Sequence, residues 1–346
     1  LKETIPLGIG FHHAGLLPII KEFIEELFGE GMVKVLYTTE TFAVGINMPA
    51  KTVCFDSLRK FDGFNFRPLS TKEFFQMAGR AGRRGIDKIG YAVSSIFRPS
   101  FNYAETKRIT SKDVEPIKSQ FQLSVNTTLN LINLHPREKI EHILRMSFWS
   151  YQQFGDNYDK IPSSKLMARY NSIVHKLEVL EYVDYDGKSL TPKGIFASKI
   201  FADEITTGEI FTTDVIKQLD EYQILLLLAG LVYEPRENDE FKSKGGGEQL
   251  RLLQKTLAGN AHLLKEKKFR ELYKINALIN PVYHGENFFM VLEQTNLLEG
   301  DLIRFYLQVL DRLGQVRKAS TDFEVRRKVE NCEGILKRAL EGIYLV

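Results

Sequence analysis

The stretch that most strongly constrains the fold is residues 76–85, Gln-Met-Ala-Gly-Arg-Ala-Gly-Arg-Arg-Gly. Its glycines let the backbone approach a ligand closely, and the spacing of Arg80 and Arg83 predicts that both lie on one face of a helical turn. Fixed guanidinium groups at this spacing suit the charge on a transferring phosphoryl group. A solvated basic turn is the alternative, but interleaved glycine and arginine behind a leading Gln76 is more specific than a charge run. The stretch therefore predicts a site at which the arginines contact a phosphoryl group.

Short strand patterns alternate with helical ones around this stretch. Residues 33–37, 52–55 and 90–96 are predicted to be short buried strands, and residues 18–29 a helix that starts with a proline. Such alternation predicts an α/β domain with a mainly parallel sheet, over residues 1–118. Because a helix-entry pattern comes almost at once, we interpret the N-terminus as a cut inside a longer chain.

Two further motifs adjoin the predicted strands. Residues 38–49, Thr-Thr-Glu-Thr-Phe-Ala-Val-Gly-Ile-Asn-Met-Pro, directly follow the first of them. Hydroxyls, a carboxylate and backbone amides at the carboxyl end of a strand suit phosphate or ribose, although a capped strand-to-helix loop explains half of this pattern. Residues 10–16, Gly-Phe-His-His-Ala-Gly-Leu, hold a histidine pair without Cys, Asp or Glu at metal-ligand spacing. We therefore expect no zinc site.

Beyond residue 117 the patterns become helical, with one hairpin signal among them. Asp186-Gly187 between two short runs is typical of a two-residue β-hairpin turn. Helices followed by one hairpin suggest a winged helix over residues 119–200, which either contacts nucleic acid or serves only as packing. Residues 201–346 are predicted to form an all-α bundle. The helices expected before the hairpin span residues 126–134, 137–154 and 165–180.

The composition limits the classes of protein that fit. Of 346 residues, 43% are hydrophobic and 26% charged, and 47 Lys and Arg against 44 Asp and Glu leave a formal net charge of +3. A histone-like basic protein is excluded, whereas a locally basic groove is not. The longest apolar run, residues 224–233, is half of the roughly 20 residues that cross a bilayer, so no membrane association is expected. Two cysteines far apart in sequence fit a reducing intracellular compartment.

Together the three motifs resemble the second RecA-like domain of a superfamily-two helicase, and within that superfamily the Ski-like DExH-box RNA helicases. Residues 59–63, Arg-Lys-Phe-Asp-Gly, are similar to the RNA-directed branch, and DNA-repair relatives tend to carry proline where this chain has Arg84. The likeness covers nearly the whole chain. It continues through residues 147–154 of the expected winged helix, residues 219–223 and 233–236, and residues 298–304, which resemble a C-terminal DSHCT-type helical domain.

The resemblance implies roles for residues near a nucleotide. Arg83, helped by Arg80, would be the arginine finger that reaches the γ-phosphate of ATP, and Gln76 would order that phosphate and its attacking water. ATP and Mg²⁺ would be bound mainly by the missing N-terminal half. The nucleotide would be bordered here by Gly45, Asn47 and Gly79.

The resemblance also implies a path for nucleic acid. Thr39, His13 and Gly15 would hold its backbone, and a ratchet helix in the C-terminal bundle would touch the bases of the threaded strand. Arg304 fits that helix, with Glu234 on the same channel wall, although an ordinary solvated charge is the alternative for Arg304. The expected apolar face consists of Leu298, Leu302, Phe305 and Val309, and the opposite face of Arg304, Gln308 and Asp311.

Two departures from the family pattern matter. The sequence contains no Gly-x-x-x-x-Gly-Lys-Ser/Thr stretch and no Asp-Glu-x-His string, so the chain alone is expected neither to bind ATP tightly nor to hydrolyse it. Only about ten residues separate Phe154 from Lys165, where exosome-associated members place a long arch insertion. Dependence on partners recruited by that arch is therefore in doubt.

We accordingly predict the C-terminal portion of an ATP-dependent Ski-like RNA helicase. Its expected partners are single-stranded RNA, or an RNA duplex with a tail, and the RNA-decay machinery. The alternatives are a non-catalytic nucleic-acid-binding scaffold, in which the arginine motif is a relic, and a DNA-unwinding relative.

Overall fold

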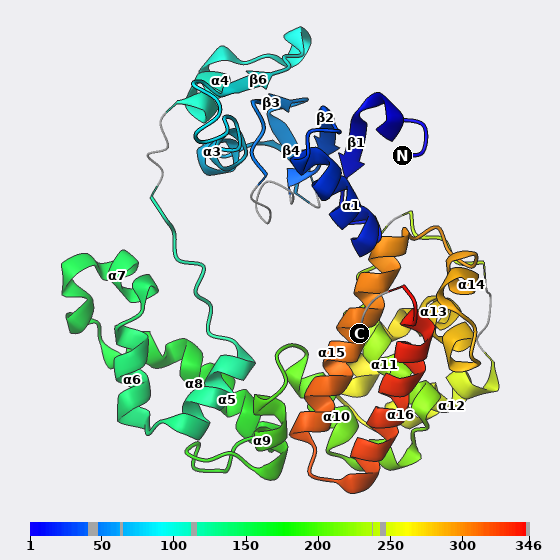
Figure 1. Cartoon of the computed structure of the whole chain (residues 1–346). Coiled ribbons are helices and arrows are strands. Elements are labelled where there is room, and N and C mark those ends of the chain that lie inside the picture. The colour runs from blue at the N-terminus through cyan, green and yellow to red at the C-terminus, as the bar shows by residue number, and fades with distance from the viewer. Residues whose placement is uncertain (41–47, 63–64, 112–115, 237, 243–246, 344–346) are drawn as a thin grey trace. The chain divides into compact units, whose positions relative to one another are not determined.

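The computed structural model describes residues 1–40, 48–62, 65–111, 116–236, 238–242 and 247–343. They belong to two compact units, Leu1–Ile117 and Lys118–Val346, which are described separately (Figure 1). Among the described helices, none has the length and apolar character that a membrane crossing requires.

The described strands of the first unit form three two-stranded sheets. Two of the sheets are parallel, and the third is an antiparallel hairpin, so these strands do not form the single mainly parallel sheet that the sequence predicts. The parallel pairs are β1 (Ile9–His12) with β2 (Val35–Thr38) and β3 (Thr52–Phe55) with β6 (Tyr91–Ser94), and the hairpin consists of β4 (Arg59–Phe61) and β5 (Phe66–Pro68).

The predicted strands β2, β3 and β6 are present, but their predicted burial is wrong. Val35, Tyr37, Tyr91 and Val93 are 48 to 69% exposed. Parallel strands are normally covered on both faces, whereas these four side chains stay open to solvent. One cluster of buried apolar residues in this unit consists of Phe55, at the end of β3, with Leu69, Phe74 and Ile109.

The described α-helices of the first unit are α1 (Pro18–Gly29), α3 (Thr71–Ala78) and α4 (Tyr103–Thr110). α1 starts at Pro18 and ends at Gly29, as predicted. α3 starts with a capping box, in which Ser70 Oγ accepts the Glu73 N–H while the Glu73 carboxylate accepts the Ser70 N–H. This cap fixes the helix on which Gln76 lies.

The second unit begins with five helices around one core (Figure 1). The predicted helices at 126–134 and 165–180 are confirmed to within two residues, but the single helix expected over 137–154 is wrong. Ser147 divides it, because its Oγ accepts the Ser150 N–H and so starts a new helix. The helices are α5 (Val125–Leu134), α6 (Arg137–Arg145), α7 (Phe148–Phe154), α8 (Ser163–Val179) and α9 (Pro192–Ser198).

The predicted hairpin between α8 and α9 is reduced to one antiparallel bridge, between Val183 and Leu190. The Asp184 N–H donates to the Ser189 carbonyl at 2.9 Å, so the loop is longer than the predicted two-residue turn. Gly187, with a φ of 67°, allows the chain to reverse there.

Several of the remaining helices pack against α11, which explains the longest apolar run of the sequence. Every residue of α11 from Tyr222 to Leu231 is buried, as expected for a helix that is apolar on all sides. Figure 1 shows α13, α15 and α16 around it. The helices are α10 (Glu204–Phe211), α11 (Glu221–Val232), α12 (Glu248–Ala258), α13 (Leu272–Tyr283), α14 (Phe288–Leu292), α15 (Glu299–Ala319) and α16 (Phe323–Leu340).

A glycine in α9 provides a test of the packing in the second unit. A Cβ added at Gly194 would lie 1.9 Å from the Tyr182 carbonyl oxygen. Because backbone must move to relieve that contact, Gly194→Ala is expected to lower the free energy of unfolding by about 1–3 kcal/mol. Gly314→Ala in α15 is the control, since beyond the adjacent backbone of its own helix no described atom lies within 4 Å of its added Cβ, and it should raise that free energy by about 0.5–1 kcal/mol. Urea titrations of both variants measure the difference, and equal effects would contradict the packing described.

Candidate nucleotide and nucleic-acid site

The arginine-rich stretch of residues 76–85 starts in the last turn of α3 and continues from Gly79 as a series of turns. α3 ends at Ala78, Ala81 forms a parallel bridge with Ala50, and Gly82 has a φ of 91°. The prediction that Arg80 and Arg83 share one face of a helical turn is therefore wrong. The bridge to Ala50 and the left-handed backbone at Gly82 take the chain out of the helix before Arg83 is reached.

Arg83 is held by a neighbouring carboxylate. Its Nε donates to Asp87 Oδ2 at 2.7 Å, its Nη2 donates to Oδ1 at 3.0 Å, and its backbone N–H also donates to Oδ2 at 3.0 Å. The Arg83 guanidinium lowers the pKa of Asp87 to about 2, so the pair is charged at neutral pH. The Arg83 side chain is 43% exposed and thus open to solvent. To contact a phosphate through these same donors, it would have to exchange Asp87 for that phosphate.

The other predicted nucleotide residues are only partly described. Gln76 is exposed on the last turn of α3, Gly79 directly follows that helix, and Arg80 is half-buried. They therefore lie in one continuous segment with Arg83. The two remaining predictions, Gly45 and Asn47, lie outside the described residues.

The predicted backbone-binding residues lie at one end of the β1–β2 pair. Because the strands are parallel with His12 opposite Thr38, His13 and Thr39 both leave the same edge of the sheet. The Thr39 N–H donates to the His12 carbonyl at 3.4 Å. The carboxyl ends of parallel strands are a common place for ligands, and Thr39 is exposed there.

His13 and Gly15 shape the loop beside Thr39. The Gly15 N–H donates to His13 Nδ1 at 3.1 Å, and the His13 ring stacks on Phe11 with centroids 5.9 Å apart. Gly15 itself is buried. Within the described parts of the chain, no group of three or more His, Cys, Asp or Glu could hold a metal ion.

The second candidate surface lies on α15. The helix has two faces, as predicted, except that Leu298 precedes its first turn and is 47% exposed. The prediction for Leu298 is wrong because that residue is the N-terminal cap position rather than part of the helix face. The buried face contains Leu302, Phe305 and Val309, and the exposed face contains Arg304, Gln308 and Asp311.

Arg304 shares a carboxylate with a second arginine that the sequence analysis missed. Asp301 Oδ1 lies 3.6 Å from Arg304 Nη2, and Arg236 Nη1 donates to Asp301 Oδ2 at 3.0 Å. The segment after α11, which includes exposed Glu234, is thereby fastened to the first turn of α15. The Tyr233 ring meets Phe305 edge-on at 5.8 Å and adds to this attachment. A pairing across 65 residues leaves no local pattern from which Arg236 could be found.

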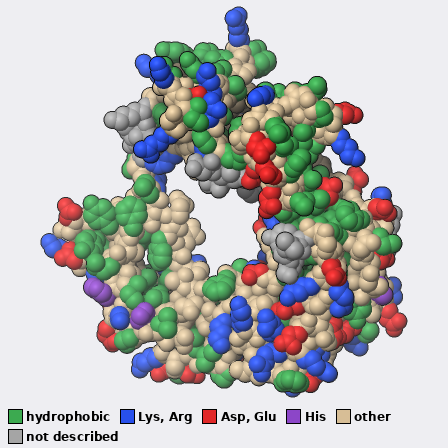
Figure 2. Space-filling model, viewed as in Figure 1, with side chains coloured by type: hydrophobic (Ala, Val, Ile, Leu, Met, Phe, Trp, Pro, Cys, Tyr) green, Lys and Arg blue, Asp and Glu red, His purple; other side chains and the backbone are tan. Residues whose placement is uncertain are grey.

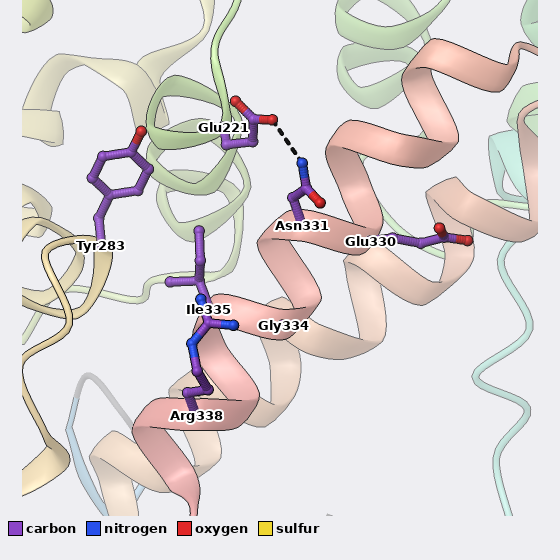
Figure 3. Close-up of a pocket in the computed structure, with 7 residues that line it drawn as sticks. All are labelled: Glu221, Tyr283, Glu330, Asn331, Gly334, Ile335 and Arg338. Atoms are coloured by element: carbon purple, nitrogen blue, oxygen red, sulfur yellow. Dashed lines mark hydrogen bonds between the residues drawn. The ribbon is translucent and has the colours of Figure 1, made fainter.

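Figure 2 shows basic and acidic side chains interspersed over the visible face of the second unit. A cavity of about 410 Å³ lies between α11, α13 and α16 (Figure 3). One wall is fixed by Asn331 Nδ2, which donates to Glu221 Oε1 at 3.0 Å. The cavity contains none of the predicted site residues. Its lining residues are Glu221, Tyr283, Glu330, Asn331, Gly334, Ile335 and Arg338.

Comparison with known proteins identifies a domain family within the second unit. Residues 187–340 match the DSHCT (NUC185) domain. Human exosome RNA helicase MTR4 is 42% identical over 183 residues, which are 50% of this chain and 17% of that protein. The Arabidopsis thaliana DExH-box ATP-dependent RNA helicase DExH9 is 49% identical over 145 residues, 42% of this chain and 14% of that protein. Antiviral helicase SKI2 of Saccharomyces cerevisiae is 46% identical over 147 residues, 42% of this chain and 11% of that protein.

The chain therefore contains a DSHCT domain, and its resemblance to the C-terminal part of the Ski-like DExH-box RNA helicases is confirmed. The similarity covers about half of the chain, and less than a fifth of the length of each of these relatives.

Proposed function

We propose that this chain is the C-terminal part of an ATP-dependent Ski-like RNA helicase that supplies the arginine finger and part of the RNA channel. Residues 1–118 would act as the second RecA-like domain, residues 119–200 as a winged helix, and residues 201–346 as the helical bundle. The observation that carries the proposal is the combination of the DSHCT match with the arginine motif of residues 76–85, which starts in the last turn of α3 in the preceding α/β unit.

The substrate of the longer protein would be ATP with Mg²⁺. This chain fits only part of a triphosphate site, because it has the guanidinium groups but no phosphate-binding loop. Closure of the two RecA-like domains would bring Arg83 to the γ-phosphate, where it exchanges Asp87 for the phosphate oxygens and stabilises the charge of the transition state. Arg80 would assist it, Gln76 would order the attacking water, and Gly45, Asn47 and Gly79 would border the nucleotide.

RNA would be held first by its backbone, at Thr39, His13 and Gly15, and then pass along α15. There Arg304 would contact bases, with Glu234 on the same wall, in a manner that tolerates different sequences. The two surfaces offer hydroxyl, backbone and guanidinium donors, which suit phosphates and bases. The name of one relative, exosome RNA helicase MTR4, supports RNA as the ligand and an RNA-decay assembly such as the exosome as the partner.

A non-catalytic nucleic-acid-binding scaffold is the second candidate. The bidentate pairing of Arg83 with Asp87 favours it, because a relic arginine would be expected to serve only in such a structural pair. The two candidates both predict RNA binding but differ in ATP turnover by the longer protein.

RNA binding by this chain tests the nucleic-acid part of the proposal. The chain should bind a fluorescein-labelled single-stranded oligouridine more tightly than oligothymidine, measured by fluorescence anisotropy over a series of salt concentrations. Affinity should fall as salt rises, because phosphate contacts release counterions. Absence of binding would contradict both candidates, and tighter binding to the DNA would favour the DNA-unwinding relative.

Arg304→Ala should weaken that binding by about fivefold, while the salt dependence keeps at least most of its slope if Arg304 contacts bases. Loss of about one unit of the slope would instead assign Arg304 to a phosphate. The matched control is Arg326→Ala, an exposed arginine near the start of α16. Equal affinities of both variants and the unaltered chain would show that Arg304 is an ordinary solvated charge.

A further inference from the structure

A network of four charged side chains connects three segments of the first unit. Lys60 Nζ donates to Glu40 at 2.7 and 2.9 Å and also lies 3.0 Å from Glu73 Oε1. Arg67 donates to both oxygens of Glu73, at 2.7 and 2.9 Å. Glu73 Oε2 additionally accepts the Ser70 N–H at 2.8 Å. Glu73 is thus the centre of the network.

Two of the three segments hold candidate site residues, and the third is the β4–β5 hairpin that connects them. Glu40 directly follows Thr39 at the end of β2. Lys60 and Arg67 lie on the two strands of the β4–β5 hairpin. Glu73 is in the first turn of α3, one turn before Gln76 and the arginine-rich stretch. The hairpin therefore joins the loop that would contact RNA to the helix that leads to the nucleotide.

The network is stronger than an ordinary surface ion pair, which contributes about 0–1 kcal/mol. The side chains of Lys60 and Glu73 are only 22 and 23% exposed, and Arg67 binds its carboxylate with two parallel hydrogen bonds. The bonds from Arg67 hold the pKa of Glu73 far below its usual range, although burial opposes this. Glu73 therefore stays charged at neutral pH.

We infer that Glu73 and Lys60 are positioning residues, which hold Thr39 and Glu40 at the end of β2 and the start of α3 in one fixed arrangement through the β4–β5 hairpin. This inference rests on the proposed function, since it assigns the network a role in RNA binding. Coupling between two sites requires a physical connection whose state affects both, and here that connection consists of hydrogen bonds and ion pairs.

The direction in which the RNA affinity changes distinguishes positioning from simple electrostatics. RNA is a polyanion, so removal of a carboxylate near its site would by charge alone tighten binding. If Glu73 and Glu40 position the RNA-contacting loop, Glu73→Gln and Glu40→Gln should each weaken binding of labelled oligouridine by about fivefold or more. Glu26→Gln on α1 is the control, because it removes an equal charge from an exposed position of the same unit.

The Lys60 variants provide a second readout. Lys60→Arg retains the charge and the donors and should retain most of the affinity, whereas Lys60→Met should lose it. Circular dichroism verifies that each variant is folded, and if Glu73→Gln unfolds the unit, Glu40→Gln, which leaves the cap of α3 intact, decides the question. If Glu73→Gln and Glu40→Gln bind the RNA as tightly as Glu26→Gln, or more tightly, the inference is wrong while the proposed function still stands. No RNA binding by the unaltered chain would overturn the proposed function and this inference with it.

Discussion

Arg83→Ala is expected to reduce RNA-stimulated ATP hydrolysis by about 10³- to 10⁵-fold in the longer helicase proposed above. The reason is electrostatic, because a guanidinium placed at the γ-phosphate stabilises charge that develops only in the transition state. Arg83 is open to solvent at the end of the arginine motif and has its donors arranged for a bidentate anion, as its pairing with Asp87 shows. Steady-state phosphate release with saturating RNA measures the loss.

Asp87→Asn is the matched control, because it breaks the same ion pair from the other side. If Arg83 acts on ATP, Asp87→Asn should cost far less activity than Arg83→Ala. If the pair only stabilises the turn after α3, the two variants should be equally impaired. Turnover of Arg83→Ala at the parent rate would show that the arginine-finger assignment is wrong.

Glu209→Ala is expected to lower the free energy of unfolding of the second unit by about 3–5 kcal/mol. Glu209 is buried in α10, where its Oε1 lies 2.5 Å from Lys193 Nζ and accepts the Tyr182 hydroxyl at 3.1 Å, while its Oε2 accepts Asn260 Nδ2 at 2.9 Å. Truncation leaves the Lys193 charge without this carboxylate in a site from which water is largely excluded. Urea unfolding followed by circular dichroism measures the change.

Two controls make that result specific. Asp214→Ala removes an exposed carboxylate that pairs with Lys217, and it should change stability by less than about 0.5 kcal/mol. The double variant Lys193→Met/Glu209→Leu leaves neither charge behind and should recover much of the loss. A Glu209→Ala variant no less stable than Asp214→Ala would contradict the network described.

Acid should weaken the same network. Burial opposes ionisation of Glu209, but the hydrogen bonds from Lys193 and Asn260 outweigh it, so the pKa of Glu209 is lowered. A carboxyl whose pKa is lower in the folded state stabilises the fold above its unfolded pKa, and this contribution decreases as the pH falls below that value. The urea concentration at the unfolding midpoint of the unaltered chain should therefore decrease once the pH falls below about 4.3. This decrease should be smaller in the double variant.

Local sequence patterns predicted the positions of helices and strands better than they predicted the burial of side chains. The helix α1 and the strands β2, β3 and β6 follow from residue spacing, which is a local property. The exposure of Val35 and Tyr91 does not follow from residue spacing, because it depends on which other elements cover the strand. A covered and an uncovered apolar strand have the same sequence pattern. Strand β1 was missed since its four residues, Ile-Gly-Phe-His, are too few to establish a period and include a glycine.

In the candidate site, too, the sequence predicted local features but not the contacts made by the fold. The motifs identified Gln76, Arg80 and Arg83 as residues of one segment, but not the backbone turn at Gly82 that separates the two arginines. Side-chain partners far away in sequence were also out of reach. Asp301 meets Arg236 across 65 residues, and Lys60 meets Glu40 across 20, because the fold and not the spacing brings them together.

ATP hydrolysis by this chain and by the longer protein, each with and without single-stranded RNA, tests the central proposal most directly. The account predicts no turnover by residues 1–346 alone and RNA-stimulated turnover once the segment with the phosphate-binding loop precedes them. Hydrolysis by the isolated chain, or a longer protein that binds RNA but never hydrolyses ATP, would contradict it.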